Sequence, residues 1–160
     1  MNRLILEPVT SHHAGEMFTV LADPTLYHFT GGEPPKNIES VRRWFTNLET
    51  RQSPDGTEHW LTWIVQLKEQ NACIGYVQAT ISDSEADVAW LIGTSWQGRG
   101  YAKEAVALLK SRLANARIKR LTANIHPDHV ASQQVASSVG LLRTGVTREG
   151  EEVWVASIAC

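Results

Sequence analysis

Two kinds of apolar pattern follow one another along this chain: continuous apolar runs typical of strands, and apolar residues at helical spacing. The changes from one pattern to the other mark the predicted elements. Apolar runs rich in β-branched and aromatic residues predict strands at residues 3–8, 60–67, 72–81 and 86–92. Pro8 ends the first strand, because proline cannot donate a hydrogen bond to a sheet ladder. The polar turns KEQN and SDSE join the other three strands, which indicates an antiparallel meander.

Apolar residues at helical spacing predict two helices before the meander. Residues 10–11 offer caps for the first helix, which extends to residue 22. The loop GGEPP at residues 31–35 follows it, and Asn37 caps the second helix. The turn SPDG at residues 53–56 then leads into the meander.

The C-terminal part returns to alternating helices and strands. A long amphipathic helix at residues 101–116 precedes a strand at 121–125, so the crossover connection makes this strand parallel to the one at 86–92. A shorter helix follows, with Asp128 as its N-cap and Gly140 as its C-terminal cap. The apolar stripe of this helix is predicted to be Ala131, Val135 and Val139.

Two final strands at residues 142–148 and 153–158, which turn at 149–151, complete the pattern. The order of elements predicts an α+β fold in which a mixed, mostly antiparallel sheet is flanked by about four helices. No repeat or linker divides the chain, so we expect one domain over residues 1–160.

The composition of the 160 residues fits a globular protein, since 42% are hydrophobic and six are tryptophan. A net charge of −2 argues against general nucleic-acid binding. The N-terminal apolar run is too short for a signal peptide and no run reaches about 18 apolar residues, so we expect a cytoplasmic protein without a membrane span. Cys73 and Cys160 are interpreted as a buried small residue and a free terminal thiol. No metal is expected, because His126 and His129 lack further ligands at a recognisable spacing.

The segment WLIGTSWQGRGYAKEA, residues 90–105, has the pattern of an anion-binding turn. A predicted strand passes through Gly98 and Gly100 into a helix whose first N–H groups and dipole favour a phosphate, and Arg99 adds a positive charge. A plain strand-to-helix turn is the alternative. Lys103 stands where a dinucleotide-binding fingerprint needs a third glycine, and no GK followed by Ser or Thr forms a Walker loop.

Gln97, Gly98, Arg99, Gly100, Tyr101 and Ala102 match the pattern Gln/Arg-x-x-Gly-x-Gly/Ala, and HPDHVASQQVASSVGLLRTG follows at residues 126–145. With these motifs the chain resembles the GNAT superfamily of N-acetyltransferases, in the branch of the ribosomal-protein N-terminal acetyltransferases. The resemblance implies acetyl-CoA as cosubstrate and a splay between the parallel fourth and fifth strands. The residues it assigns to the cofactor are Leu91, Ile92, Gly93, Gln97, Gly98, Arg99, Gly100, Tyr101, Ala102, Lys103, His129 and Ser132.

Acetyl transfer needs a neutral amine, a polarised thioester carbonyl and a stabilised leaving thiolate. Within the resemblance, the tyrosine that many members use to protonate the thiolate would fall at Ala136, and His129 replaces a common Asn. Ser132 matches a serine of the N-terminal acetyltransferase branch, so it is assigned the acid or thiolate-stabilising role. An ordinary serine at a helix N-terminus is the alternative. His129 is a candidate to bind the pantetheine or shuttle a proton.

Two residues are candidate general bases. Asp87 lies at the acidic position of the branch's fourth strand, and His126 ends the fifth. The alternative for Asp87 is a solvated or paired carboxylate. Glu104 matches a recurrent glutamate of the branch, but its place on the first helical turn favours an interaction with the helix dipole.

The resemblance places the acceptor between the first two helices and the middle strands, and at least half of the aromatic residues available there are expected to be buried. They are Tyr27, His28, Phe29, Trp44, Trp60, Trp63 and Tyr76. The branch favours an N-terminal α-amine of a protein or peptide as the acceptor. A small metabolite or antibiotic amine is the alternative, and a non-catalytic acyl-CoA sensor is a third hypothesis. Either a monomer or a homodimer fits the sequence.

Overall fold

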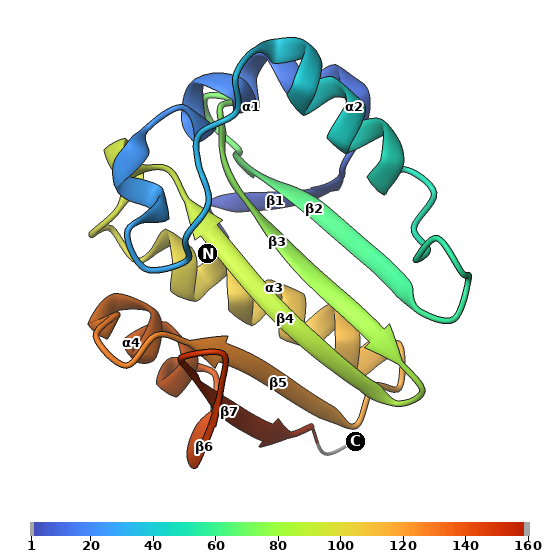
Figure 1. Ribbon diagram of the computed structural model, residues 1–160, viewed down its shortest axis with the longest axis vertical. Helices are drawn as coiled ribbons and strands as arrows, with labels where there is room; N and C mark the ends of the chain where they lie inside the picture. Colours follow the sequence, from blue (N-terminus) through green and yellow to red (C-terminus); the bar gives the residue numbers. More distant parts are fainter. Residues whose placement is uncertain (1, 159–160) are drawn as a thin grey trace.

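The computed structural model describes residues 2–158, which form one seven-stranded sheet in the order β1-β2-β3-β4-β5-β7-β6 (Figure 1). The strands are β1 (Leu4–Pro8), β2 (His59–Leu67), β3 (Cys73–Ser82), β4 (Glu85–Ile92), β5 (Arg120–Ile125), β6 (Leu142–Arg148) and β7 (Glu151–Ser157). The helices are α1 (Ala14–Leu21), α2 (Ile38–Leu48), α3 (Tyr101–Asn115) and α4 (Val130–Ser138). All pairs are antiparallel except β4 with β5, so the predicted mixed α+β sheet is confirmed.

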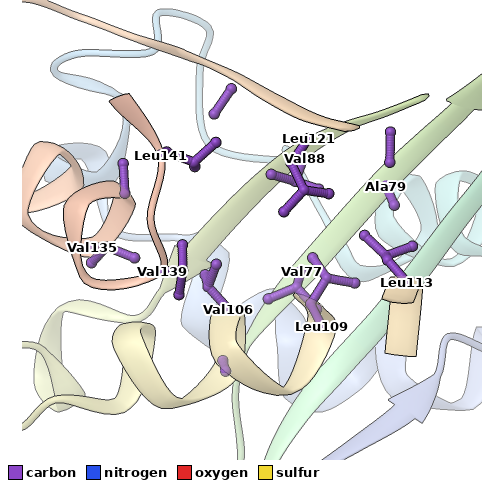
Figure 2. Close-up of a cluster of buried hydrophobic side chains, with 14 of the residues drawn as sticks. Val77, Ala79, Val88, Val106, Leu109, Leu113, Leu121, Val135, Val139 and Leu141 are labelled. Atoms are coloured by element: carbon purple, nitrogen blue, oxygen red, sulfur yellow. The ribbon is translucent and has the colours of Figure 1, made fainter. Parts of the chain in front are cut away.

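Helices cover both faces of the sheet and divide the core into two clusters. On one face, α3 packs Val106, Leu109 and Leu113 against β3, β4 and β5, with α4 alongside (Figure 2). On the other face, α1 and α2 enclose Met17 and Phe45, which are fully buried. α1 and α2 lie over one half of the sheet only (Figure 1). At the β4–β5 junction, the same face of the sheet carries polar side chains such as Asp87 and Thr122.

The ends of the helices show which capping predictions the structure confirms. The Asn37 side chain accepts the Ser40 N–H at 2.8 Å, as predicted for the N-cap of α2. Gly140, at φ +89°, follows α4, and the Leu141 N–H donates to Ala136 O at 3.0 Å. This pairing satisfies a carbonyl at the helix end, so the predicted C-terminal glycine is confirmed.

Several details of the sequence prediction are wrong. The first predicted helix is divided into a 3₁₀ turn at Ser11–His13 and α1, because His13 Nδ1 folds back to accept the Thr10 N–H at 2.9 Å. α1 ends at Leu21 with Ala22 as its C-cap, close to the predicted end, but the 3₁₀ turn that follows at Pro24–Tyr27 was not predicted. Ala131 is exposed, and Ala136 takes its place in the α4 stripe.

Cys73 is buried and free, as expected, and burial raises the pKa of its thiol to about 11. Cys160 lies outside the described residues. Among residues 2–158, no helix is both long enough and apolar enough to cross a membrane.

Candidate active site

The turn between β4 and α3 has a backbone that only its glycines adopt without strain. Gly98 and Gly100 have φ of +80° and +83°, in the left-handed region. Gly100 is the N-cap of α3, and no side chain caps the helix there. A β-carbon at Gly98 would meet no atom within 4 Å, so open space lies in front of the turn.

The backbone of this turn presents a row of hydrogen-bond donors. Within residues 2–158, the N–H groups of residues 98–103 donate to no protein acceptor. The dipole of α3 adds positive potential at the same place, and Arg99 and Lys103 are exposed beside it. These donors and charges have the arrangement that binds phosphate groups at helix N-termini.

A long-range ion pair holds the turn against the start of β1. The Glu104 carboxylate accepts the Arg3 backbone N–H at 2.7 Å and Arg3 Nε at 2.9 Å. Arg3 Nη1 donates to Arg99 O at 3.1 Å, and the guanidinium carbon lies 4.4 Å from the Tyr101 ring centroid. The sequence pattern alone does not indicate this role of Arg3, because its partner Glu104 is 101 residues away.

We expect Glu104→Gln to lower thermal stability modestly without impairing activity. The exchange removes a charge-assisted pair that is partly exposed, and such pairs contribute about 0.2–1 kcal/mol. Thermal unfolding should show a Tm lower by roughly 1–4 °C, with kcat within about twofold of wild type. Glu69→Gln, in the exposed KEQN turn, is the matched control. A large loss of kcat with an unchanged Tm would place Glu104 in catalysis.

The parallel strands diverge next to this turn, as the resemblance implied. β4 and β5 pair only over Glu85–Asp87 against Arg120–Thr122. Beyond them, β4 continues beside β3 to Ile92, and β5 continues beside β7 to Ile125 (Figure 1). The facing edges of the two strands therefore carry backbone groups without a strand partner, and we call this open region the splay.

The alternation of the antiparallel ladder shows which groups of β4 face the splay. The Gly93 N–H donates to Ile74 O at 2.7 Å. Because alternate residues of an antiparallel strand bond to the same neighbour, Leu91 also bonds to β3. Trp90 and Ile92 therefore direct their backbone N–H and C=O groups toward the splay. Ile92 O accepts Gln97 Nε2 at 2.9 Å. This side chain thereby ties the glycine turn to the end of β4.

Two candidate residues lie together at the start of α4, across the splay. Ser132 Oγ is 3.3 Å from His129 Nε2, and both side chains are half-buried. Desolvation and the nearby His126 lower the pKa of His129. The imidazole is therefore mainly neutral at neutral pH, and its tautomer decides which of the two residues donates.

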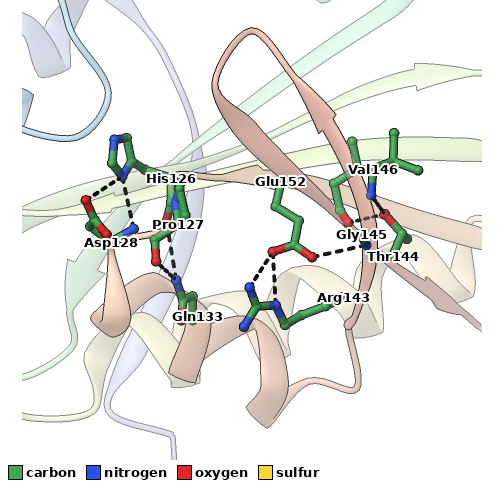
Figure 3. A network of polar contacts seen from close by, with 10 residues as sticks. His126, Pro127, Asp128, Gln133, Arg143, Thr144, Gly145, Val146 and Glu152 are labelled. Atoms are coloured by element: carbon green, nitrogen blue, oxygen red, sulfur yellow. Dashed lines mark hydrogen bonds and ion pairs between the residues drawn. The ribbon is translucent and has the colours of Figure 1, made fainter.

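The turn that leads into α4 differs from the prediction. Asp128 is not the N-cap: its backbone N–H donates to His126 Nδ1 at 3.0 Å (Figure 3). The helix starts at Val130, with His129 in the cap position. Gln133 Nε2 donates to Pro127 O at 2.8 Å and closes the turn from the helix side. These contacts fix His126 at the end of β5 with its Nδ1 occupied.

Asp87 lies where the splay opens, in the last residue pair between β4 and β5. Its Oδ1 accepts Thr122 Oγ1 at 2.9 Å and Asn124 Nδ2 at 3.4 Å. Desolvation raises the pKa of Asp87, and the bond from Thr122 partly offsets this. A contact between Asp87 and His126 is not observed in the described residues, so the two candidate bases are separate.

A cavity of about 530 Å³ adjoins Asp87 and is lined by Asn124, Arg148, Glu149 and Glu151. Desolvation raises the pKa of Glu151, the charge of Asp87 acts in the same direction, and His126 lowers it. Glu149 and Glu151 are close together in the sequence, but Asp87 is more than 60 residues away, so the sequence does not show that the three carboxylates meet beside Arg148.

The prediction for the seven aromatic residues of the expected acceptor site is only partly correct. None of the seven residues is fully buried, so the expectation that at least half are core residues is wrong. Trp60 and Tyr76 pack on the α1–α2 side, and Trp44 meets Tyr76 edge-on at 5.9 Å. Trp63 lies on the α3 face under Arg112, because successive residues of β2 point to opposite faces.

Comparison with known proteins gives one family and many similar folds. The model of the acetyltransferase (GNAT) domain matches residues 3–142. RimL, a ribosomal-protein α-N-acetyltransferase solved with coenzyme A, is 18% identical with a TM-score of 0.82, over 99% of this chain and 96% of its own. No curated protein matches the sequence significantly.

Two further solved structures have a similar fold. The aminoglycoside acetyltransferase AAC(6')-Ib, solved with ribostamycin and coenzyme A, is 18% identical with a TM-score of 0.79, over 98% of this chain and 94% of its own. A domain from Methanocaldococcus jannaschii is 21% identical with a TM-score of 0.76, over 97% of this chain and 98% of its own. At these identities the similarity establishes the fold.

Proposed function

Because this chain belongs to the GNAT acetyltransferase family, we propose that it transfers the acetyl group of acetyl-CoA directly to a primary amine, with an N-terminal α-amine of a protein or peptide as the favoured acceptor. The observation that carries the proposal is the glycine turn at the edge of the splay. There, six N–H groups without a protein acceptor meet open space and the positive end of α3. Similar folds solved with coenzyme A support it.

In this proposal the diphosphate of acetyl-CoA binds the N–H groups of residues 98–103, with Arg99 and Lys103 as counter-charges. The amide-bearing pantetheine arm pairs with the splay-facing groups of Trp90 and Ile92, as a strand would. Leu91 bonds to β3, so the Ile92 N–H is the better donor to the thioester carbonyl. Gly93 and Gln97 shape the end of β4: the Gly93 N–H donates to Ile74 O, and the Gln97 side chain donates to Ile92 O.

The reaction forms a C–N bond and breaks the C–S bond. The neutral amine attacks the thioester carbonyl, the Ile92 N–H stabilises the developing oxyanion, and the sulfur leaves as a thiolate. Ser132 O–H donates a hydrogen bond to that thiolate. The amine nitrogen releases one proton to solvent and the thiolate takes one proton from solvent, so the number of protons is unchanged.

We expect Ser132→Ala to lower kcat about 10-fold, because a hydroxyl that stabilises the thiolate acts mainly in the transition state. The KM for acetyl-CoA should change little. Steady-state kinetics with thiol detection measure both constants. Ser137→Ala, an exposed serine of the same helix, should behave as wild type. Equal kcat in Ser132→Ala and wild type would reduce Ser132 to a structural residue.

The acceptor determines how much help the amine needs to lose its proton. A peptide α-amine has a pKa near 8 and is partly neutral at physiological pH, whereas an alkylamine resembles lysine. We therefore expect Asp87→Asn and His126→Ala each to retain substantial activity on a peptide α-amine. The bonds from Thr122 and Asn124 support a structural role for Asp87. The pH profile of kcat/KM for both variants is the measurement. Loss of all activity, with folding and coenzyme A binding intact, would show a dedicated base.

A small polycationic amine is the second candidate, and the carboxylates beside the splay favour it. Glu149 and Glu151 line the cavity together with Arg148, and the nearby Asp87 adds a third carboxylate, so the local charge favours a cationic acceptor. Thiol release from acetyl-CoA, measured over a panel of peptides and small polyamines, separates the candidates. A higher kcat/KM for peptides supports the favoured acceptor, and the reverse order supports the alternative. Binding of acetyl-CoA without thiol release for any amine would contradict both.

A further inference from the structure

One aromatic side chain bridges the two halves of the molecule at the open end of the splay. Phe29 lies in the segment between the 3₁₀ turn Pro24–Tyr27 and α2, on the α1–α2 side of the sheet. Its ring stacks on the His129 imidazole, with centroids 4.5 Å apart and planes at 15°. It also meets His126 at 5.3 Å, and His28 meets its edge at 4.7 Å.

The contact between Phe29 and His129 lies at the end of the splay where β4 and β5 form no backbone hydrogen bonds with each other. β4 and β5 are joined only at the opposite end, through three residue pairs. Phe29 reaches from the half that contains β4 to the start of α4, in the half that contains β5. Its stacking partner His129 is the N-cap residue of α4 and makes no capping hydrogen bond, so the helix itself does little to fix the imidazole.

The orientation of the imidazole decides what Ser132 can do. If His129 Nε2 carries the proton, it donates to Ser132 Oγ, and the hydroxyl proton is available to another acceptor. If Nε2 is unprotonated, Ser132 donates to it, and the hydroxyl proton is no longer available. A rotated ring loses the contact in either tautomer.

We propose that Phe29 is a positioning residue for acetyl transfer: its stacked ring holds His129 with Nε2 toward Ser132 Oγ, so that in the tautomer with its proton on Nε2 the imidazole donates to Ser132 Oγ and leaves the Ser132 O–H free for the departing thiolate. This inference rests on the proposed function. Phe29 forms and breaks no covalent bond. The reaction still forms the C–N bond and breaks the C–S bond of the thioester. The same ring connects the segment before α2 to the start of α4 across the open end of the splay.

The test compares Phe29→Leu, which removes the ring, with Phe29→Tyr, which keeps it. Phe29→Leu should lower kcat about 3- to 10-fold, and Phe29→Tyr should retain it. Phe18→Leu is the matched control, because Phe18 is also a half-buried ring but lies on α1 and packs against the core cluster between α1 and α2. It should lower stability and leave kcat unchanged.

A double-mutant cycle separates positioning from packing. If Phe29 acts through Ser132, then Phe29→Leu in the Ser132→Ala background should lower kcat by less than about twofold further. Full additivity of the two losses, or a lower Tm for Phe29→Leu with unchanged kcat, would overturn the proposal.

A spectroscopic readout keeps this test independent of turnover. The imidazole nitrogen shifts of His129 report its tautomer, and they should change in Phe29→Leu but not in Phe18→Leu. Should the wild-type protein transfer no acetyl group, the proposed function fails. The shifts then still show whether Phe29 positions His129, and unchanged shifts would refute that role.

Discussion

Gly100→Trp is expected to weaken coenzyme A binding about 100-fold or more, which corresponds to roughly 2.7 kcal/mol. Two physical effects act together. The φ of +83° strains any L side chain, and the new β-carbon would lie 3.5 Å from Arg3 Nη2, so the indole must displace Arg3 or enter the space in front of the turn. Calorimetric titration with coenzyme A measures the change.

The control for backbone strain is Gly56→Trp. Gly56 has a φ of +76°, lies in the turn before β2, and a β-carbon there would meet no atom within 4 Å. This variant should lose stability and keep its affinity for coenzyme A. Unchanged affinity in a folded Gly100→Trp protein would show that the cofactor binds elsewhere.

Gly75→Ala is expected to destabilise the protein by on the order of 3 kcal/mol, because the added methyl group meets backbone that has no free space. Gly75 lies opposite Ile92 in the β3–β4 ladder. A β-carbon there would lie 2.0 Å from Leu91 O and 3.0 Å from Ile92 Cα, so β4 must shift next to the splay. Urea denaturation should show the loss as a lower midpoint.

Gly15→Ala provides the matched control for the same chemical change. Gly15 lies in α1, where a β-carbon would meet no atom within 4 Å and alanine is the better helix former. It should be neutral or stabilise by about 0.5–1 kcal/mol. A Gly75→Ala protein as stable as wild type would mean that β3 and β4 are less tightly packed than the structure indicates.

The order of the elements could be predicted well from the sequence. Each helix or strand buries one face, so its apolar residues recur at the spacing typical of that element. The helix with Val106, Leu109 and Leu113 and the strand with Leu121, Ala123 and Ile125 bury one face each, so their spacing identifies them. The glycine turn was also recognisable, since its left-handed backbone demands glycine at particular positions. These features depend on residues that are close together in the chain.

The features that were missed depend on contacts between distant residues. The Arg3–Glu104 pair and the stacking of Phe29 on His129 leave no periodic signal, because each joins segments that only the folded sheet brings together. Asp128 satisfied the rule for an N-cap residue, but a histidine two residues earlier accepted its backbone N–H and shifted the helix start. The cavity has the same origin, because the fold brings Asn124 of β5 next to the β6–β7 turn with Arg148, Glu149 and Glu151.

The central claim is that coenzyme A binds along the turn at the start of α3 and the splay-facing edge of β4. A titration of the isotope-labelled protein with coenzyme A, followed through its backbone amide shifts, tests this claim directly. The largest shifts should occur at residues 98–103 and at Ile92, with small changes in α2. Shifts concentrated around Arg148 and Glu151, with residues 98–103 unaffected, would contradict it.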